Sequence, residues 1–241
     1  MPNVLMINPA SEQFGGMLSR YVPVGVPVAT GILTAYLQKH GYFVKVHDEE
    51  MGELNAEILK GLCKDFEKPL MIGISVLTVQ AHRAYHLIKM IKNIYPRSIV
   101  ILGGIHVTAL PDEGIQAGAD FVVRGEGEIP FLSLARALSH QEDWTNINGI
   151  SYRKEDGTIH HNPDGELIRD LDTVPMFPYE LFQDPRYDMG FITGARGCPY
   201  TCSYCSQRLL TGLTYRFHSP KRVVEQLDLL INKYRQKHIL F

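Results

Sequence analysis

Cysteine is scarce in this sequence: the chain of 241 residues contains four, and three of them lie between Cys198 and Cys205. Neither charge is in clear excess, because the formal net charge is −2, so nothing indicates a nucleic-acid or anionic-membrane surface. The longest apolar runs, such as PLMIGISVL, are too short to span a bilayer. A Walker phosphate loop and a Gly-x-Ser-x-Gly motif are also absent, which argues against the chemistries that depend on them.

The first residues, MPNVLMINPA, lack the basic region and the cleavage site of a secretory signal peptide. We therefore expect a cytoplasmic protein. In that compartment clustered cysteines more often bind metal or react than form disulfides. The three clustered cysteines are accordingly the first candidates for a functional site.

Short apolar runs alternate with helical patterns from residue 3 to about residue 139, which predicts five βα units. The predicted strands are 4–7, 43–46, 70–75, 98–102 and 121–123. The predicted helices are one that begins at Pro27 and ends before Gly41, one with an apolar face from Leu54 to Phe66, one with a face from Ala84 to Ile91, a short one opened by Pro111, and one over IPFLSLARAL. Two strands are almost wholly apolar, as in parallel sheets covered on both faces. Residues 1–140 are thus predicted to form a doubly wound α/β, Rossmann-like domain.

Residues 141–189 differ in character and are predicted to form a hairpin and a linker. GISYRKEDGTIHHN alternates apolar and polar residues around Asp156-Gly157, and TVPMFPYELFQDP is rich in proline and aromatics. GFITGARG then predicts a strand that leads into the cysteine loop. Ser219-Pro220 predicts the start of a helix with the apolar face Val223, Val224, Leu227, Leu230, Ile231 and Tyr234. HILF predicts another strand, so we expect residues 190–241 to be the incomplete start of a second domain.

The segment RGCPYTCSYC spaces its cysteines as C-x3-C-x2-C. Three thiolates can each hold one iron of a [4Fe–4S] cube, which leaves the fourth iron without a protein ligand and open to a substrate or cofactor. A structural zinc site needs a fourth ligand, for which His218 is the candidate, although its spacing fits no common zinc finger. A disulfide would leave one cysteine over. Cys63 lies near the apolar face of its helix and is predicted to be a buried packing residue.

CPYTCSYC resembles the signature of the radical S-adenosylmethionine (radical SAM) enzymes, C-x3-C-x-aromatic-C. The resemblance implies that Cys198, Cys202 and Cys205 bind a [4Fe–4S] cluster and that S-adenosylmethionine chelates its open iron, with Tyr204 near the adenine. It further implies that an electron from the cluster cleaves S-adenosylmethionine to a 5′-deoxyadenosyl radical. An electron donor such as flavodoxin or ferredoxin and a small-molecule substrate are then expected as partners.

Small and polar residues follow three strands of the predicted Rossmann-like domain, at the edge where such domains bind ligands. They are Ser75 and Thr78, then Gly103, Gly104 and His106, then Gly125 and Glu126. SVL and GG at the first two positions, together with GGIHVTALPDE and RGEGE, resemble the cobalamin-binding domains that precede radical SAM barrels. The resemblance covers nearly the whole chain and implies that these residues contact cobalamin. Taken alone, each glycine motif is typical of a turn, and Glu126 could simply favour the following helix through its dipole.

One loop departs from the general cobalamin-binding pattern, which places Asp-x-His-x-x-Gly after the first strand. Here that loop reads NPASEQFGG and contains no histidine. Cobalamin is therefore expected to lack this lower ligand, with His106 or water as alternatives. His47-Asp48 lies at the same edge and could touch a cofactor, but a pair in such a loop more often forms only a turn.

The resemblance implies a cobalamin-dependent radical SAM enzyme, either a methyltransferase or an oxidative cyclase acting on an unactivated position. Two other hypotheses stay open. One is a cobalamin carrier or sensor whose cysteine loop is structural or inactive. The other is a relative of the tRNA-modifying methylthiotransferases, although those carry extra cluster cysteines in the N-terminal domain and only Cys63 is available here. Because the chain lacks most of a barrel, we expect it to be inactive alone.

Overall fold

The computed structural model describes residues 3–11 and 24–240. In this part of the chain the main sheet has seven strands in the order β3-β1-β4-β5-β6-β7-β8. The strands are β1 (Asn3–Asn8), β3 (Phe43–Asp48), β4 (Met71–Ser75), β5 (Ile99–Gly103), β6 (Phe121–Val123), β7 (Ile150–Arg153) and β8 (Ile159–His161). The first five are parallel, and each matches a predicted strand to within two residues at either end. The doubly wound α/β fold is confirmed.

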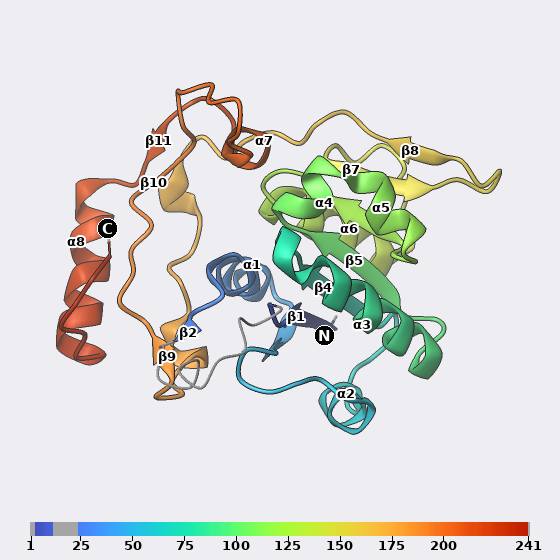
Figure 1. Ribbon diagram of the computed structural model, residues 1–241, viewed down its shortest axis with the longest axis horizontal. Helices are drawn as coiled ribbons and strands as arrows, with labels where there is room; N and C mark the ends of the chain where they lie inside the picture. The colour runs from blue at the N-terminus through green and yellow to red at the C-terminus, as the bar shows by residue number, and fades with distance from the viewer. Residues whose placement is uncertain (1–2, 12–23, 241) are drawn as a thin grey trace.

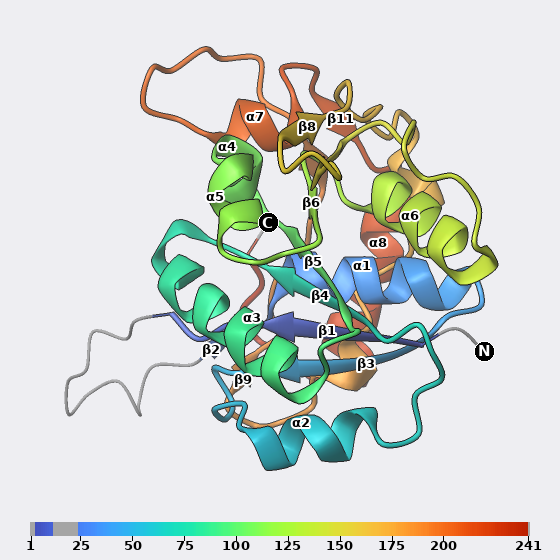
Figure 2. The ribbon, with the colours of Figure 1, turned by 90° about the vertical axis from the view of Figure 1, so that its right-hand side faces the viewer.

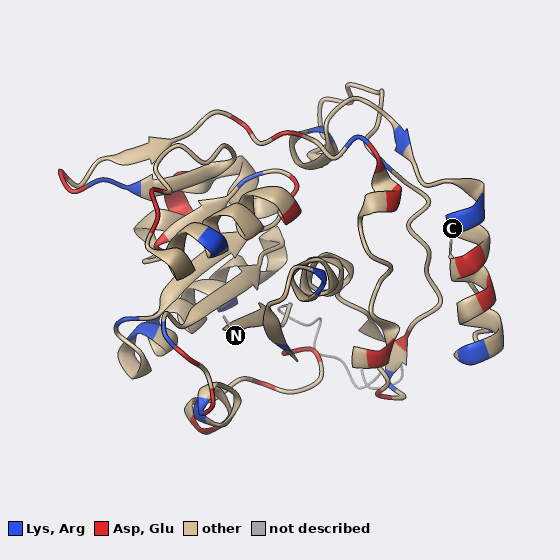
Figure 3. Ribbon diagram, turned by 180° about the vertical axis from the view of Figure 1, so that it is seen from behind, with Lys and Arg blue, Asp and Glu red and all other residues tan. Residues whose placement is uncertain are grey.

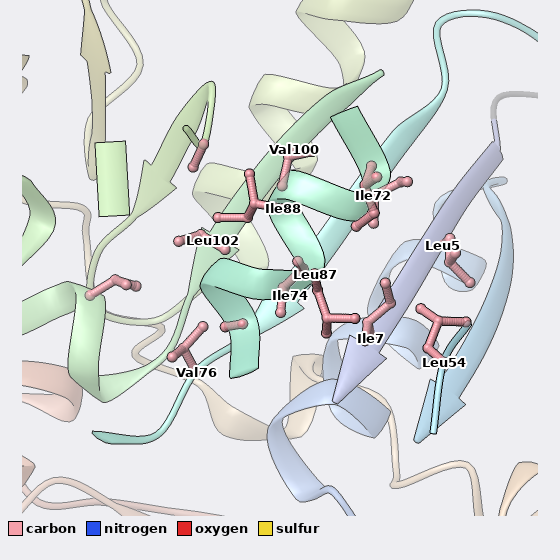
Figure 4. Close-up of a cluster of buried hydrophobic side chains, with 14 of the residues drawn as sticks. Leu5, Ile7, Leu54, Ile72, Ile74, Val76, Leu87, Ile88, Val100 and Leu102 are labelled. Carbon is pink, nitrogen blue, oxygen red and sulfur yellow. The ribbon is translucent and has the colours of Figure 1, made fainter. Parts of the chain in front are cut away.

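Helices cover both faces of this sheet, as Figures 1 and 2 show. They are α1 (Val28–Lys39), α2 (Ala56–Cys63), α3 (Ala81–Ile94), α4 (Ile105–Ala109), α5 (Pro111–Gln116) and α6 (Glu128–His140). One face packs against α2 and α3 through a cluster that includes Ile72, Leu87 and Ile88 (Figure 4). The other packs against α1 and α6 through Leu37, Met71 and Phe131. In α3 the predicted apolar positions Ala84, Leu87, Ile88 and Ile91 are all buried.

Helix α4 is a five-residue helix that the sequence did not predict. It starts directly after Gly104, whose φ of +100° is accessible mainly to glycine. A Cβ on Gly104 would lie 2.7 Å from the carbonyl oxygen of Val76, so this sharp entry also needs the absence of a side chain. Val76 follows β4 and Gly104 follows β5, so this close approach cannot be predicted from the local sequence of either segment.

The predicted hairpin forms β7 and β8 and extends the main sheet, because β7 pairs antiparallel with β6. The predicted linker that follows is not an extended, exposed chain, because many of its apolar side chains are buried. Its side chains form a third core with α1 and the last helix of the chain: Val26, Ile32, Ile168, Leu171, Val174, Phe177, Tyr179, Phe182, Ile192 and Leu230. A short parallel pair, β2 (Val24–Gly25) with β9 (Tyr187–Asp188), joins it to the segment before α1. In Figure 1 this segment lies between α1 and α8.

The C-terminal part contains β10 (Ala195–Arg196), α7 (Gln207–Thr211), β11 (Arg216–Phe217), α8 (Pro220–Asp228) and a π-helical turn, Leu229–Lys233. The prediction of a continuous strand over 190–197 was wrong. Only β10 is a strand there, paired antiparallel with β11, while Phe191 makes an isolated parallel bridge to Leu240. The bridge is held by Ile192 N–H to Leu240 O at 2.9 Å and by Leu240 N–H to Gly190 O at 2.8 Å.

The predicted helix start at Ser219 is confirmed, because the Ser219 hydroxyl accepts a hydrogen bond from Arg222 N–H at 3.2 Å. The apolar face of α8 and of the π-helical turn is narrower than predicted. Leu230 is fully buried, whereas Val224 and Ile231 are 61% and 48% exposed. None of the described helices is long and apolar enough to cross a membrane. Basic and acidic residues are interspersed along the ribbon (Figure 3), in keeping with the near-neutral composition.

Candidate functional site

A cavity of about 320 Å³ lies at the carboxyl edge of β4, β5 and β6. Its rim at the sheet edge includes Ser75, Gly103, Gly104 and Gly125, four of the residues predicted to contact a ligand. From there it extends between the sheet and helices α1 and α6, where the lining is apolar: Met6, Ile32, Leu33, Ile101 and Phe131. This is the edge at which open α/β sheets bind their ligands.

The opposite wall of the cavity comes from the two ends of the cysteine loop. Three residues precede the first cysteine and three follow the last: Thr193, Ala195, Arg196, Gln207, Leu210 and Thr211. Helix α7, which follows Cys205, also packs against α4 at the sheet edge. The sheet edge and the cysteine loop therefore enclose one shared space, although their lining residues are about 70 to 135 positions apart in the sequence.

Thr108 ties two of the glycine-rich loops together. Its hydroxyl donates to Gly104 O at 2.8 Å and accepts a hydrogen bond from Gly125 N–H at 3.1 Å. It lies on α4, and sequence reasoning missed it. The signal was present in the predicted edge motif GGIHVTALP, but a lone threonine is not distinctive before the loops are seen together.

Gly103 and Gly125 leave the backbone open to the cavity that they line. A Cβ on Gly103 would approach only Val123 O, at 3.8 Å, and one on Gly125 only Leu210 O, at 3.6 Å. A bulky flat ligand can therefore come close to the main chain at these two points. Together with the Ser75 hydroxyl, this open edge and the apolar interior fit part of a corrinoid cofactor.

His106 and Thr78 are not among the residues that line this cavity. His106 is buried, and its Nε2 lies 3.0 Å from the Tyr85 hydroxyl and 3.6 Å from a Glu113 carboxylate oxygen. Its ring is therefore directed to α3 and α5. Thr78 is exposed in a 3₁₀ turn, Thr78–Gln80. Their contact with cobalamin stays a prediction.

Glu126 lines the cavity but its carboxylate is fully engaged by protein groups. Arg216 donates to both of its oxygens, at 2.7 and 3.0 Å, and Ile168 N–H donates at 2.9 Å. Burial acts to raise the pKa of Glu126, but the hydrogen bonds from Arg216 and Ile168 outweigh it and hold the pKa below its usual range. A cobalamin contact of this residue also stays a prediction.

The cysteine loop is irregular and largely exposed. Gly197 has a φ of +89°, and a Cβ there would lie 2.0 Å from Thr214 O, so only glycine fits before the first cysteine. Cys198 is half-buried, whereas Cys202 and Cys205 are exposed, and Tyr204 is 90% exposed. Within the described residues, no three Cys, His, Asp or Glu side chains are close enough to hold a metal ion. Cluster ligation by these cysteines and the adenine contact of Tyr204 therefore stay predictions.

The donor set of the loop nevertheless suits a cluster better than the alternatives. All four cysteines are free. His218, the candidate fourth zinc ligand, has its Nδ1 3.1 Å from an Asp172 carboxylate oxygen. Cys63 is buried in the core, and burial raises its pKa to about 11, which confirms the prediction of a packing residue.

The loop that follows β1 is described only as far as Ser11, and residues 12–16 lie outside the described residues. In the described part, Ala10 N–H donates to Glu49 at 3.2 Å and Ser11 N–H donates to Glu50 at 2.7 Å. At the end of β3, Asp48 accepts from the Asn8 side chain at 2.8 Å, and His47 Nε2 lies 2.9 Å from Gly52 O. His47 and Asp48 are thus the last two residues of β3, and the turn follows them at residues 49–51.

Comparison with known proteins agrees with this geometry. A family model described as the B12 binding domain matches residues 17–135. An uncharacterised methyltransferase of Pyrococcus horikoshii is 33% identical over 99% of this chain and 52% of its own length. An anaerobic magnesium-protoporphyrin IX monomethyl ester cyclase of Rubrivivax gelatinosus is 28% identical over 96% and 43%, respectively. The chain thus spans about half the length of the curated relatives that it matches.

A solved structure shares the fold. The radical S-adenosylmethionine methyltransferase TsrM of Kitasatospora setae superposes with a TM-score of 0.77 at 21% identity, over 97% of this chain and 46% of that one. Another structure of TsrM contains cobalamin and a [4Fe–4S] cluster. The similarity covers both the Rossmann-like domain and the segment that carries the cysteines.

Proposed function

We propose that the chain belongs to the cobalamin-binding radical SAM family, and that the whole protein is a cobalamin-dependent radical SAM enzyme; the B12 binding domain match and the related methyltransferase support this. Residues 1–140 would form its cobalamin-binding domain, 141–189 the hairpin and linker, and 190–241 the start of the radical SAM barrel. The named relatives include methyltransferases and a cyclase. We therefore propose methyl transfer or oxidative cyclisation at an unactivated position of a small molecule.

One observation carries this proposal: the glycine-rich sheet edge and the two ends of the cysteine loop line the same cavity. A ligand that rests on Gly103 and Gly125 would face whatever the loop binds. A carrier with an unrelated cysteine loop has no need of this shared space. The arrangement suits a reaction in which two cofactors act on one substrate.

We further propose a place for each cofactor. Cys198, Cys202 and Cys205 would hold the [4Fe–4S] cluster, with Tyr204 beside S-adenosylmethionine, and the edge from Ser75 to Gly125 would hold cobalamin. When bound, these cofactors supply one-electron cleavage of S-adenosylmethionine and methyl-group carriage. The protein's own contribution would be to fix the two binding edges opposite each other and to line the interior of the cavity with apolar side chains that exclude water. Reduction would require a donor protein such as flavodoxin or ferredoxin.

Anaerobic reconstitution tests the proposal. The protein is treated with iron, sulfide and hydroxocobalamin, and bound iron, sulfide and corrinoid are measured with and without S-adenosylmethionine. We expect about four iron and four sulfide per chain, one corrinoid, and a cluster spectrum that S-adenosylmethionine perturbs. Binding of a single zinc ion, or of corrinoid without a cluster, would contradict the enzyme.

Matched variants separate the two sites. Cys202→Ser should abolish the cluster and leave corrinoid binding intact, whereas Gly103→Val should weaken corrinoid binding and leave the cluster intact. Cys63→Ser serves as the cysteine control, because Cys63 is buried in the core of the Rossmann-like domain. It should retain both cofactors.

A further inference from the structure

Four charged side chains meet where the cysteine loop joins the Rossmann-like domain. Glu126 and Glu128 come from the loop after β6 and the first turn of α6, and Arg196 and Arg216 come from β10 and β11. Arg196 lies 2.6 Å from Glu128 and 3.5 Å from Glu126, and Arg216 lies 2.7 Å from Glu126. We call these four residues the junction cluster.

The junction cluster is almost completely buried. The side chains of Glu126, Glu128 and Arg216 are 3%, 7% and 7% exposed, and that of Arg196 is 15% exposed. Burying four charges is costly, and well-packed apolar residues of similar size are often as stable or more stable. Arg216 Nε is also buried without a hydrogen-bond partner, which adds to the cost. A gain in stability therefore does not account for the four buried charges. A need to hold β10 and β11 in one fixed position against the start of α6 does account for them.

The two arginines hold both stems of the cysteine loop. Arg196 is two residues before Cys198, and it is paired with Arg216 across the β10–β11 ladder. Arg216 also donates to the carbonyl oxygen of Thr211, the last residue of α7, at 2.8 Å and to Ile168 O at 2.6 Å. Arg196 thus links the sheet edge to the N-terminal end of the segment that carries the three cysteines, and Arg216 links it to the C-terminal end.

We infer that the junction cluster positions the cysteine loop over the cavity and so sets the separation between the group that the loop binds and the group that the sheet edge binds. This inference rests on the proposed function for its chemical meaning. Arg196 and Glu128 act here as positioning residues, because they touch the loop stem and the α6 turn. Directional, charge-assisted hydrogen bonds fix such a separation more sharply than apolar packing does.

The first experiment uses the metal-free protein and needs no cofactor. Hydrogen exchange is measured by mass spectrometry for the wild type, Arg196→Gln, and the double variant Glu128→Arg/Arg196→Glu. We expect at least about tenfold faster exchange over residues 197–212 in Arg196→Gln, unchanged exchange in α3, and partial restoration in the double variant. Arg153→Gln is the matched control, since Arg153 is exposed and its hydrogen bonds, to Gly157 O and Ile115 O, do not involve the cysteine loop. Equal exchange in Arg196→Gln and wild type overturns the inference.

The second experiment uses the reconstituted protein and reports on the distance between the bound corrinoid and the cluster. The magnetic coupling between Co(II) cobalamin and the reduced cluster is measured by electron paramagnetic resonance. Arg196→Gln should retain full iron and corrinoid content but show altered coupling, and in the whole protein kcat for S-adenosylmethionine cleavage should fall about 10- to 100-fold with KM unchanged. Arg196→Lys, which keeps the charge, should recover part of both.

The outcomes separate this inference from the proposed function. Unchanged coupling in Arg196→Gln, or loss of either cofactor from that variant, contradicts a positioning role. If the wild type itself binds no cluster, the proposed function fails. The hydrogen-exchange comparison then still decides whether the junction cluster orders the loop.

Discussion

The Tyr187 hydroxyl donates a 2.8 Å hydrogen bond to Asp48 Oδ2, although the two residues are 139 positions apart. Asp48 ends β3 and is buried, and Asn8 donates to its other oxygen at 2.8 Å. Burial raises the pKa of Tyr187, and the hydrogen bond and the charge of Asp48 raise it further, so the phenol stays protonated and donates. The linker is therefore anchored to the carboxyl edge of the main sheet.

Tyr187→Phe removes this hydrogen bond and keeps the ring. We expect the free energy of unfolding to fall by about 1.5–3 kcal/mol, the range for a bond to a charged group, because Asp48 loses one of its donors. Denaturant titration measures the change. Tyr200→Phe is the control, since Tyr200 is 73% exposed. Equal stability of the two variants would show that the linker is not anchored through Asp48.

Gly31 in α1 is expected to be intolerant of a side chain. A Cβ there would lie 2.1 Å from the ring of Phe177, which is itself packed among Tyr179, Phe182 and Phe191. We expect Gly31→Ala to destabilise the protein by about 1–3 kcal/mol, the usual cost of overpacking.

Replacement of Gly61 in α2 by alanine is expected to have the opposite effect on stability. Nothing lies within 4 Å of a Cβ there, so Gly61→Ala should stabilise the protein by about 0.5–1 kcal/mol through helix propensity alone. Thermal and denaturant unfolding of both variants tests the pair. Stabilisation by Gly31→Ala would mean that Phe177 does not dock on α1.

The sequence predicted the Rossmann-like domain well because its strands are buried on both faces and its helices show clear apolar faces. Ile72 and Val100, for example, lie in runs that are almost wholly apolar, as is typical of a central parallel strand. The linker was harder to interpret. Its prolines and aromatics suggested a tether, yet Phe177 and Tyr179 form the centre of the third core. Its high aromatic content was the available signal.

The candidate site was predictable where residue types are distinctive and not where it depends on distant partners. The cysteine spacing and the Gly103-Gly104 pair are visible as motifs. The pairing of Arg196 with Glu128 is not, because the two lie 68 positions apart and each looks like an ordinary charged residue. His106 was chosen for its place in a motif, but its ring is directed to Tyr85, which only the packing of α3 against α4 reveals.

Thr108→Val should loosen the two glycine-rich loops while preserving the shape of the side chain. The hydrogen bond that the hydroxyl donates to Gly104 O and the one that it accepts from Gly125 N–H are both lost. We therefore expect the free energy of unfolding to fall by about 1–2 kcal/mol. Hydroxocobalamin should bind about tenfold more weakly, as measured by titration of its absorbance, because a 1.4 kcal/mol change is tenfold in affinity. Thr108→Ser keeps the hydroxyl and should behave as the wild type. Equal affinity of the wild type, Thr108→Val and Thr108→Ser for hydroxocobalamin would exclude a role for the Thr108 hydroxyl in binding.

Acid should weaken the junction cluster. The folded-state pKa of Glu126 lies below its ordinary value of 4.5, so its contribution to stability is fully present above about pH 4.5 and is lost as pH falls through the folded-state pKa. Glu126→Gln should be destabilised near neutral pH by about 3 kcal/mol, because Arg216 loses its buried partner. The difference from wild type should shrink as the pH is lowered. Unfolding curves as a function of pH test this, with Glu142→Gln, at an exposed position, as the control; a difference that does not change with pH would contradict it.

The three clustered cysteines should be separable from Cys63 by their reactivity. Burial raises the pKa of Cys63 to about 11, so at pH 8 only about one thiol in a thousand is the reactive thiolate. Cys202 and Cys205 are exposed and Cys198 is half-buried. Iodoacetamide should therefore modify three cysteines of the native, metal-free protein, with Cys198 the slowest, and the fourth only in denaturant. Prior reconstitution with iron and sulfide should protect those three, as peptide mass mapping would show. Modification of all three at an unchanged rate after reconstitution would mean that they do not hold the cluster.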